Sequence, residues 1–133
     1  MSKHESWRTR HYWQRIGGLL IEEFLVVPQS RKEGIARRLI DGVIVLGEET
    51  DCRVGGDFDI RGRDIICVQT KSNRSGMYLM GQAYFSRLLL EAFEPSSIKT
   101  VAICGSNDPV MARLCQAHEI EVIVIPESVR PIK

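Results

Sequence analysis

Two polar residues, Gln69 and Lys71, close an apolar run that begins at Ile65. Residues two apart in a strand project from the same face, so the amide and the amine would lie together at its end. An acidic residue heading a neighbouring strand would complete a small site, and Asp41 stands upstream in the sequence Arg-Arg-Leu-Ile-Asp-Gly-Val-Ile-Val. One carboxylate, one carbonyl-type oxygen and one lysine suit a hard divalent cation and a phosphodiester.

The run that carries Gln69 is apolar on both sides. Its residues are Ile65 and Cys67 on the face of Gln69, and Ile66 and Val68 on the other face. A strand that is apolar on both faces is typical of the middle of a sheet covered on both sides, and a polar amide there needs a hydrogen-bond partner. Taken singly, Asp41 fits an ordinary strand or turn start, and Lys71 fits a solvated strand end.

Length and composition are those of one globular domain. A chain of 133 residues can build one core, and 44% hydrophobic with 26% charged residues is an ordinary balance, so we expect a single domain over 1–133. No apolar run approaches the roughly 20 residues that span a bilayer. The sequence before Trp7 lacks the apolar core of a signal peptide. These features predict a cytoplasmic protein with no membrane partner.

The net charge of the chain and the spacing of its cysteines and histidines bear on nucleic-acid binding and on zinc binding. The net charge of +1 gives no general attraction to nucleic acid, and basic residues cluster only locally, as Arg31, Lys32, Arg37 and Arg38 do around Glu33. The four cysteines form no Cys-x-x-Cys pair and the three histidines form no His-x-x-x-His pair, so a zinc site is not indicated. We expect the thiols to be buried and reduced.

Hydrophobic periodicity and turn residues predict an α/β fold with a mixed central β-sheet flanked by helices. Helices are expected at about 3–16, ended by Gly17-Gly18, at about 77–93, and from the entry signal Asn107-Asp108-Pro109 to about 118. Strands are expected at 19–27, 37–46, 57–60, 64–71, 100–104 and 121–125, with polar loops at 29–36 and 47–56. Residues 57–71 are typical of an antiparallel hairpin, whereas the late strand-helix-strand unit implies parallel strands.

Taken together, these positions resemble the PD-(D/E)XK nuclease superfamily, in the pattern of Holliday-junction resolvases and restriction-type endonucleases. The acid of the first helix is matched by Glu5, the aspartate of the second core strand by Asp41, and the (D/E)-x-K motif by Gln69-Thr70-Lys71. Gln82 matches an inward glutamine that often follows in the next helix. The resemblance covers roughly residues 3 to 104. It implies a restriction endonuclease-like core, αβββαβ, with a C-terminal αβ extension.

The resemblance implies metal-dependent hydrolysis of phosphodiester bonds, in double-stranded DNA, with Mg²⁺ as cofactor and Mn²⁺ as a substitute. Asp41 would bind the metal directly, Gln69 through its side-chain oxygen and Thr70 through its main-chain carbonyl. Glu5 would act through water or a second ion, and Lys71 would orient the attacking water. The residues expected to bind substrate are Lys32, Arg37, Arg38, Arg74 and Gln82. Nucleases that act on duplexes often work as twofold dimers, so a homo-oligomer is expected.

The sequence departs from the family pattern and leaves alternatives open. Gln69 stands where the family usually has an acid, and Ile40 where it usually has proline. With one negative charge fewer, the domain is alternatively a catalytically inactive nuclease-fold protein that binds DNA or acts in an assembly. Acids that compete with Asp41 are Asp57 and Asp59, before the motif strand, and Glu22 and Glu23, in the first strand.

A second alternative is a small α/β domain that binds a nucleotide or a protein partner. It would use the loop Gly105-Ser106-Asn107, which lies between a strand and a helix, because helix N-termini bind anions. The loop has neither the G-x-G-x-x-G nor the P-loop spacing, which counts against this interpretation.

Overall fold

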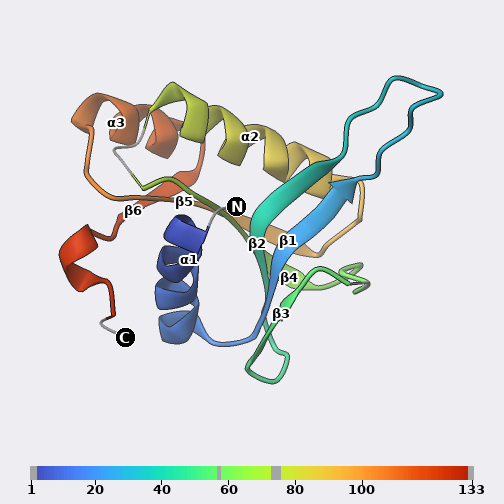
Figure 1. Ribbon diagram of the computed structural model, residues 1–133, viewed down its shortest axis with the longest axis horizontal. Helices are drawn as coiled ribbons and strands as arrows, with labels where there is room; N and C mark the ends of the chain where they lie inside the picture. Colours follow the sequence, from blue (N-terminus) through green and yellow to red (C-terminus); the bar gives the residue numbers. More distant parts are fainter. Residues whose placement is uncertain (1–2, 57, 73–75, 132–133) are drawn as a thin grey trace.

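The computed structural model of the chain describes residues 3–56, 58–72 and 76–131, and only the backbone of residues 3–5. Its elements are α1 (Lys3–Ile16), β1 (Leu19–Val27), β2 (Arg38–Val45), β3 (Asp51–Val54), β4 (Asp64–Thr70), α2 (Met77–Glu91), β5 (Ser97–Cys104), α3 (Pro109–Ala117), β6 (Ile120–Val124) and a short 3-10 helix, η1 (Glu127–Val129). α1 covers one face of the sheet, and α2 and α3 cover the other (Figure 1). The predicted α/β fold with a mixed sheet flanked by helices is confirmed.

The six strands form one sheet in the order β3-β1-β2-β4-β5-β6. β2 pairs antiparallel with both of its neighbours, so β1, β2 and β4 form an antiparallel meander. β5 and β6 add parallel to β4, as expected for strands joined by the helical crossovers α2 and α3. Within the described residues, no helix is both long enough and apolar enough to cross a membrane.

Two helix boundaries follow directly from local sequence signals. α1 ends at Ile16 because Gly17 and Gly18, at φ of 83° and 81°, adopt the left-handed conformation that glycine allows. α3 begins at Pro109, whose fixed φ suits a first helical position, and the side chain of Asp108 caps it. Both predicted boundaries are confirmed.

The strand predicted at 57–60 is wrong, and so is the hairpin built on it. Residues 58–60 form no strand, and residue 57 lies outside the described part of the chain. Phe58 packs against the core between the sheet and α2, and Ile60 is fully buried there. Their alternation with exposed Asp59 imitates the period of a strand, although both side chains enter the core from irregular backbone.

β3 lies instead inside the predicted loop 47–56, as an edge strand. It pairs parallel with the first half of β1, and its residues are exposed or half-buried. Gly55 and Gly56, both at positive φ, end it. Elsewhere the differences are small: β5 begins at Ser97 rather than residue 100, and α2 ends at Glu91 rather than residue 93.

β4 is the central strand that the sequence predicts. Every one of its residues except Asp64 is buried. Ile65 and Cys67 pack in the core beneath α2, whereas Ile66 and Val68 pack in the core beneath α1. The polar end of the strand therefore lies between two layers of helices.

Two arginines fix α1 to distant parts of the chain. Arg8 is 1% exposed, donates from Nε to the carbonyl of Ile125 at 2.7 Å and stacks on Trp7. Arg10 binds both carboxylate oxygens of Glu22, at 2.7 and 3.1 Å. Glu22 is 2% exposed, and a buried carboxylate requires such a partner. α1 is thereby held against β1 and the end of β6.

Gly105 brings the ends of β4 and β5 into close contact. A Cβ on Gly105 would overlap the carbonyl oxygen of Ser72 and would lie 3.2 Å from an Arg8 nitrogen. Beside it, the Lys71 N–H donates to the carbonyl of Ile103 at 2.9 Å. The backbone around Lys71 is thus held by β5, and glycine is required for the approach.

Gly105→Ala is expected to lower the free energy of unfolding by about 3 kcal/mol, because the added methyl meets main-chain atoms rather than a flexible side chain. Gly81→Ala is the matched control. Nothing lies within 4 Å of its added Cβ, and alanine replaces glycine inside a helix, so stability should rise by about 1 kcal/mol. Urea unfolding followed by tryptophan fluorescence measures both changes. A Gly105→Ala protein as stable as wild type would contradict the close contact.

Candidate functional site

β2 and β4 separate at the end of their shared ladder. The last paired residues are Gly42 and Val68. Beyond them, Asp41 Oδ2 accepts a hydrogen bond from the Thr70 N–H at 2.9 Å, across a sequence separation of 29 residues. A side-chain oxygen thus replaces a main-chain acceptor, and the same register extended by one residue places Asp41 beside Gln69. The structure brings the predicted acid and the predicted motif together.

Asp41 does not head its strand, contrary to the expectation. β2 begins at Arg38, because its first residues pair with β1 before the pairing with β4 starts. Asp41 instead directly precedes the segment of β2 that pairs with β4, and it is half-buried. The opening between two strands, rather than a strand end, is what makes room for its carboxylate.

Glu23 of β1 lies opposite Asp41 of β2, because Glu22 and Phe24 pair with Gly42 and Ile40, the two neighbours of Asp41. Its φ of 54° is in the left-handed region, which is uncommon for a residue other than glycine. The alternation of β1 is interrupted there: Glu22 binds Arg10 on the α1 side, and Phe24 belongs to the core beneath α2. The two competing acids of β1 are therefore separated, with Glu22 in a structural ion pair and Glu23 opposite Asp41.

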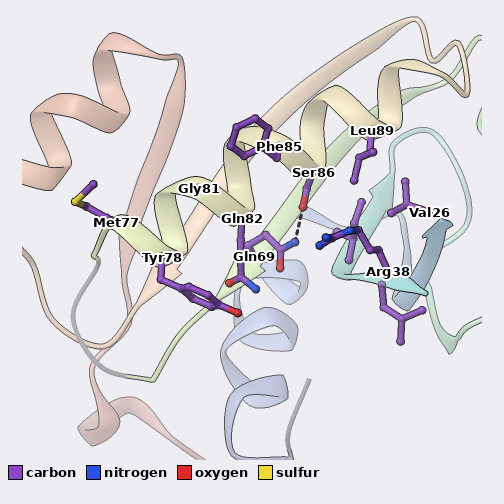
Figure 2. A pocket seen from close by; sticks show the side chains of 12 residues that line it. Val26, Arg38, Gln69, Met77, Tyr78, Gly81, Gln82, Phe85, Ser86 and Leu89 are labelled. Atoms are coloured by element: carbon purple, nitrogen blue, oxygen red, sulfur yellow. Dashed lines mark hydrogen bonds between the residues drawn. The ribbon is translucent and has the colours of Figure 1, made fainter. Parts of the chain in front are cut away.

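Gln69 is anchored to α2 by its amide nitrogen. Nε2 donates to Ser86 Oγ at 2.6 Å, and both residues are buried. The side-chain oxygen is turned away from Ser86, toward the space that Gln82 and Arg38 border (Figure 2). The predicted need for a partner is met by Ser86. Sequence reasoning missed this serine, although it stands among apolar residues at helical spacing on the buried side of α2.

Lys71 reaches the same side of the sheet as Gln69. Its Nζ lies 4.9 Å from the centroid of the Tyr78 ring, in the first turn of α2, which is a favourable cation–π distance. Tyr78 is an exposed side chain that the sequence did not single out. The expectation that Gln69 and Lys71 share one face agrees with these contacts, since both reach α2.

A cavity of about 360 Å³ lies between α2 and the open ends of β2 and β4. Two of the predicted substrate-binding residues, Arg38 and Gln82, line it together with Gln69 (Figure 2). Lys32 and Arg37 lie outside this lining, on the exposed connection between β1 and β2. Arg74 and the side chain of Glu5 lie outside the described part of the chain.

Asp59, one of the two competing acids before the motif strand, does not reach this place. Asp59 lies outside the strands, exposed, and its Oδ1 accepts the N–H of Arg61 in a local turn. It precedes the start of β4, at the opposite end of the strand from Gln69. Asp57 lies outside the described residues. Asp41 is therefore the acid that the register sets beside the motif.

The predicted metal ligands are all oxygens: the Asp41 carboxylate, the Gln69 side-chain oxygen and the Thr70 carbonyl. Within the described part of the chain, no three or more His, Cys, Asp or Glu side chains form a group that could hold a metal ion. A few oxygen ligands from the protein suit Mg²⁺, because this ion usually keeps several water molecules in its coordination shell. Because Ser86 engages the amide nitrogen, the oxygen of Gln69 is the atom presented to an ion. A set with one carboxylate and two neutral oxygens would hold Mg²⁺ only weakly.

Cys67 lies two residues before Gln69 but contributes no chemistry. Burial, and to a lesser extent the charge of Asp41, raises the pKa of Cys67 to about 12. A buried, protonated thiol is a weak nucleophile and a weak metal ligand. All four cysteines are free, and Cys52 alone among them is not fully buried, close to the prediction of buried, reduced thiols.

The loop Gly105-Ser106-Asn107 is already used by the fold. Gly105 provides the close approach to Ser72, and the Asp108 side chain accepts the first N–H groups of α3, from Val110 and Met111. The groups that would bind an anion at this helix N-terminus thus have a partner within the chain. The geometry gives no support to a nucleotide site here.

Asp41→Ala is expected to lower the free energy of unfolding by about 1–2 kcal/mol, because the Thr70 N–H loses a charged acceptor. Asp41→Asn keeps an acceptor oxygen and should lose less than about 1 kcal/mol. Asp59→Ala is the control, because that carboxylate accepts a hydrogen bond only in an exposed turn. Its removal should lower the free energy of unfolding by about 0.5 kcal/mol or less. Thermal unfolding by circular dichroism compares the three. An Asp59→Ala loss as large as that of Asp41→Ala would contradict the assigned role.

The structure therefore sets Asp41 beside Gln69, and Lys71 follows two residues further along the chain. Arg38, Gln69 and Gln82 line the adjoining cavity, whose lining includes neither Asp41 nor Lys71. Comparisons of the chain with protein-family models, with curated proteins and with solved structures give no match.

Proposed function

We propose that the chain is a metal-dependent nuclease of the PD-(D/E)XK superfamily, which hydrolyses phosphodiester bonds in double-stranded DNA with Mg²⁺. The observation that carries the proposal is the hydrogen bond from Thr70 to Asp41, because it joins an acid of one strand to the Gln-x-Lys motif of the next. The Asp41 carboxylate is thereby held at the end of a buried strand, beside the residues of the motif.

The order and pairing of the elements support the same proposal. With β3 set aside as an insertion at the edge of the sheet, α1, β1, β2, β4, α2 and β5 follow one another as αβββαβ. The three strands of the meander are antiparallel, and β5 joins them parallel to β4. α3 and β6 correspond to the C-terminal αβ extension that the resemblance implies.

Each residue of the site has a separate task in the proposed reaction. Asp41, the Gln69 oxygen and the Thr70 carbonyl would hold Mg²⁺, which when bound lowers the pKa of a water and offsets the charge of the phosphate. Lys71, half-buried at the end of the motif strand, can orient the attacking water and stabilise the charge that develops on the phosphate. Arg38, at the cavity, can bind a phosphate oxygen through its guanidinium.

The connection between β1 and β2 carries basic side chains that can bind the DNA backbone. It extends away from the body of the sheet (Figure 1). Arg31, Lys32, Arg37 and Arg38 are all exposed on it or at its end, and among the described residues none of the four takes part in an ion pair. Such residues bind phosphates without reading sequence, and they make affinity depend on salt.

Gln69 favours a second candidate, a nuclease-fold protein that binds DNA without cleaving it. Its amide brings no negative charge, and its nitrogen is committed to Ser86. A site with one carboxylate holds a cation less tightly than a site with two. Both candidates bind DNA and they differ only in hydrolysis, so a cleavage assay separates them.

The protein is expected to nick supercoiled plasmid DNA with Mg²⁺ or Mn²⁺ and to leave it intact in EDTA. Lys71→Met keeps most of the length of the side chain without its charge and should slow nicking by at least about a hundredfold. Lys99→Met is the matched control, because Lys99 is an exposed lysine that pairs with Glu121 outside the cavity lining. Its nicking rate should equal that of wild type, measured by gel electrophoresis over time.

The outcomes separate the candidates. Intact DNA with both metals, combined with a mobility shift of the same DNA, would support the non-cleaving candidate. DNA that is neither cut nor bound would reject a nucleic-acid function. Equal nicking by Lys71→Met and wild type would reject this site as the source of the activity.

A further inference from the structure

The outward side of α2 carries several large apolar side chains. The buried side carries Leu79, Ala83 and Leu90. The outward side carries Met77, Tyr84, Phe85 and Leu88, which are 80%, 37%, 62% and 43% exposed. No charged residue occurs from Met77 to Ser86. A helix that is apolar on both sides is typical of one that is covered on both sides.

α3 continues this apolar surface. It lies beside α2 on the same face of the sheet (Figure 1) and adds Val110 and Leu114, which are 57% and 45% exposed. A groove of about 430 Å³ lies between the two helices, with Met80 and Met111 in its lining. We define the α2–α3 surface by its exposed residues Met77, Tyr84, Phe85, Leu88, Val110 and Leu114.

Gly81 lies within the α2–α3 surface, and no packing contact inside the monomer requires a glycine there. Glycine inside a helix is unfavourable relative to alanine, and nothing lies within 4 Å of the Cβ that alanine would add. Helices approach each other more closely where the side chains at the contact are small. A glycine at the centre of an exposed apolar helix face therefore points to another helix packed across it.

We propose that a second copy of the chain packs on the α2–α3 surface. At the observed exposures, each of its six side chains offers on the order of 100 Å², which together is a large share of the roughly 800 Å² per partner of a stable complex. The six residues that define the surface are uncharged, so a twofold interface, which brings the same patch against itself, sets no like charges among these six opposite each other. None of the six side chains is a cation, and the nearby Arg87 and Arg113 lie outside the defined surface, so the surface itself offers no charge to a phosphate.

The α2–α3 surface also borders the candidate site. Met77, Gly81 and Phe85 line both the cavity beside Gln69 and the groove between α2 and α3. A second copy on this surface would place two cavities near one twofold axis. The inference goes beyond the proposed function and does not depend on it, because it stands on the exposed apolar residues alone.

Sedimentation velocity over a concentration series, from micromolar to roughly a hundredfold higher, tests the proposal. Wild type is expected to sediment as a dimer. Leu114→Glu should raise the dissociation constant by at least about tenfold, because it buries an unpaired charge in the interface. Leu25→Glu is the matched control, since Leu25 has almost the same exposure, 44% against 45%, and lies on β1. It should leave the dimer unchanged.

Gly81→Leu provides a variant whose effect does not come from unfolding. Leucine favours the helix and keeps the surface apolar, but its bulk prevents close approach of a second helix. We expect a higher melting temperature for the monomer and weaker association. Wild type that remains monomeric over the whole series would overturn the proposal and leave a different protein as occupant. A dimer that Leu114→Glu and Gly81→Leu do not weaken would overturn it as well, because its interface would lie elsewhere.

Discussion

The geometry of the candidate site depends on one hydrogen bond, from the Thr70 N–H to the Asp41 carboxylate. A main-chain N–H at the end of a buried strand must have an acceptor. Because β2 and β4 stop pairing at Gly42 and Val68, a side chain supplies it instead. The carboxylate is thereby held where two strands open, beside Gln69, and the polar groups of the site follow from that opening.

Gln69, Thr70 and Lys71, at the end of β4, contact elements on both sides of the sheet. Gln69 bonds to α2 through Ser86, and Lys71 pairs with β5 through its N–H while its side chain lies on the first turn of α2. Thr70 faces the other way, with its hydroxyl 2.8 Å from the Thr9 hydroxyl of α1. Such alternation follows from the period of a strand. The site is therefore built on rigid elements from both sides of the sheet.

Much of this framework could be predicted, since local chemistry decides it. The two-sided apolar run of β4 identifies a central strand, and Asp108 ahead of a proline identifies a helix start. Residue types, spacing and the resemblance also led to the prediction that Asp41 and Gln69 belong to one site, and the structure sets these two residues side by side. The strand prediction for residues 58–60 was wrong, because apolar residues that enter a core from irregular backbone show the same apolar-polar alternation as a strand. Ser86 and Glu23 were not assigned their places, since these depend on how α2 is rotated over the sheet and on a local irregularity of β1.

Calorimetric titration with Mg²⁺ tests most directly whether Asp41 and Gln69 hold a metal. Wild type should bind weakly, and Asp41→Asn should abolish binding because it removes the carboxylate of the ligand set. Gln69→Glu should bind more tightly, since it adds a second carboxylate while the Ser86 hydroxyl can donate to it in place of accepting. Binding by Asp41→Asn as tight as that of wild type, or no gain from Gln69→Glu, would contradict a metal site at the opening between β2 and β4.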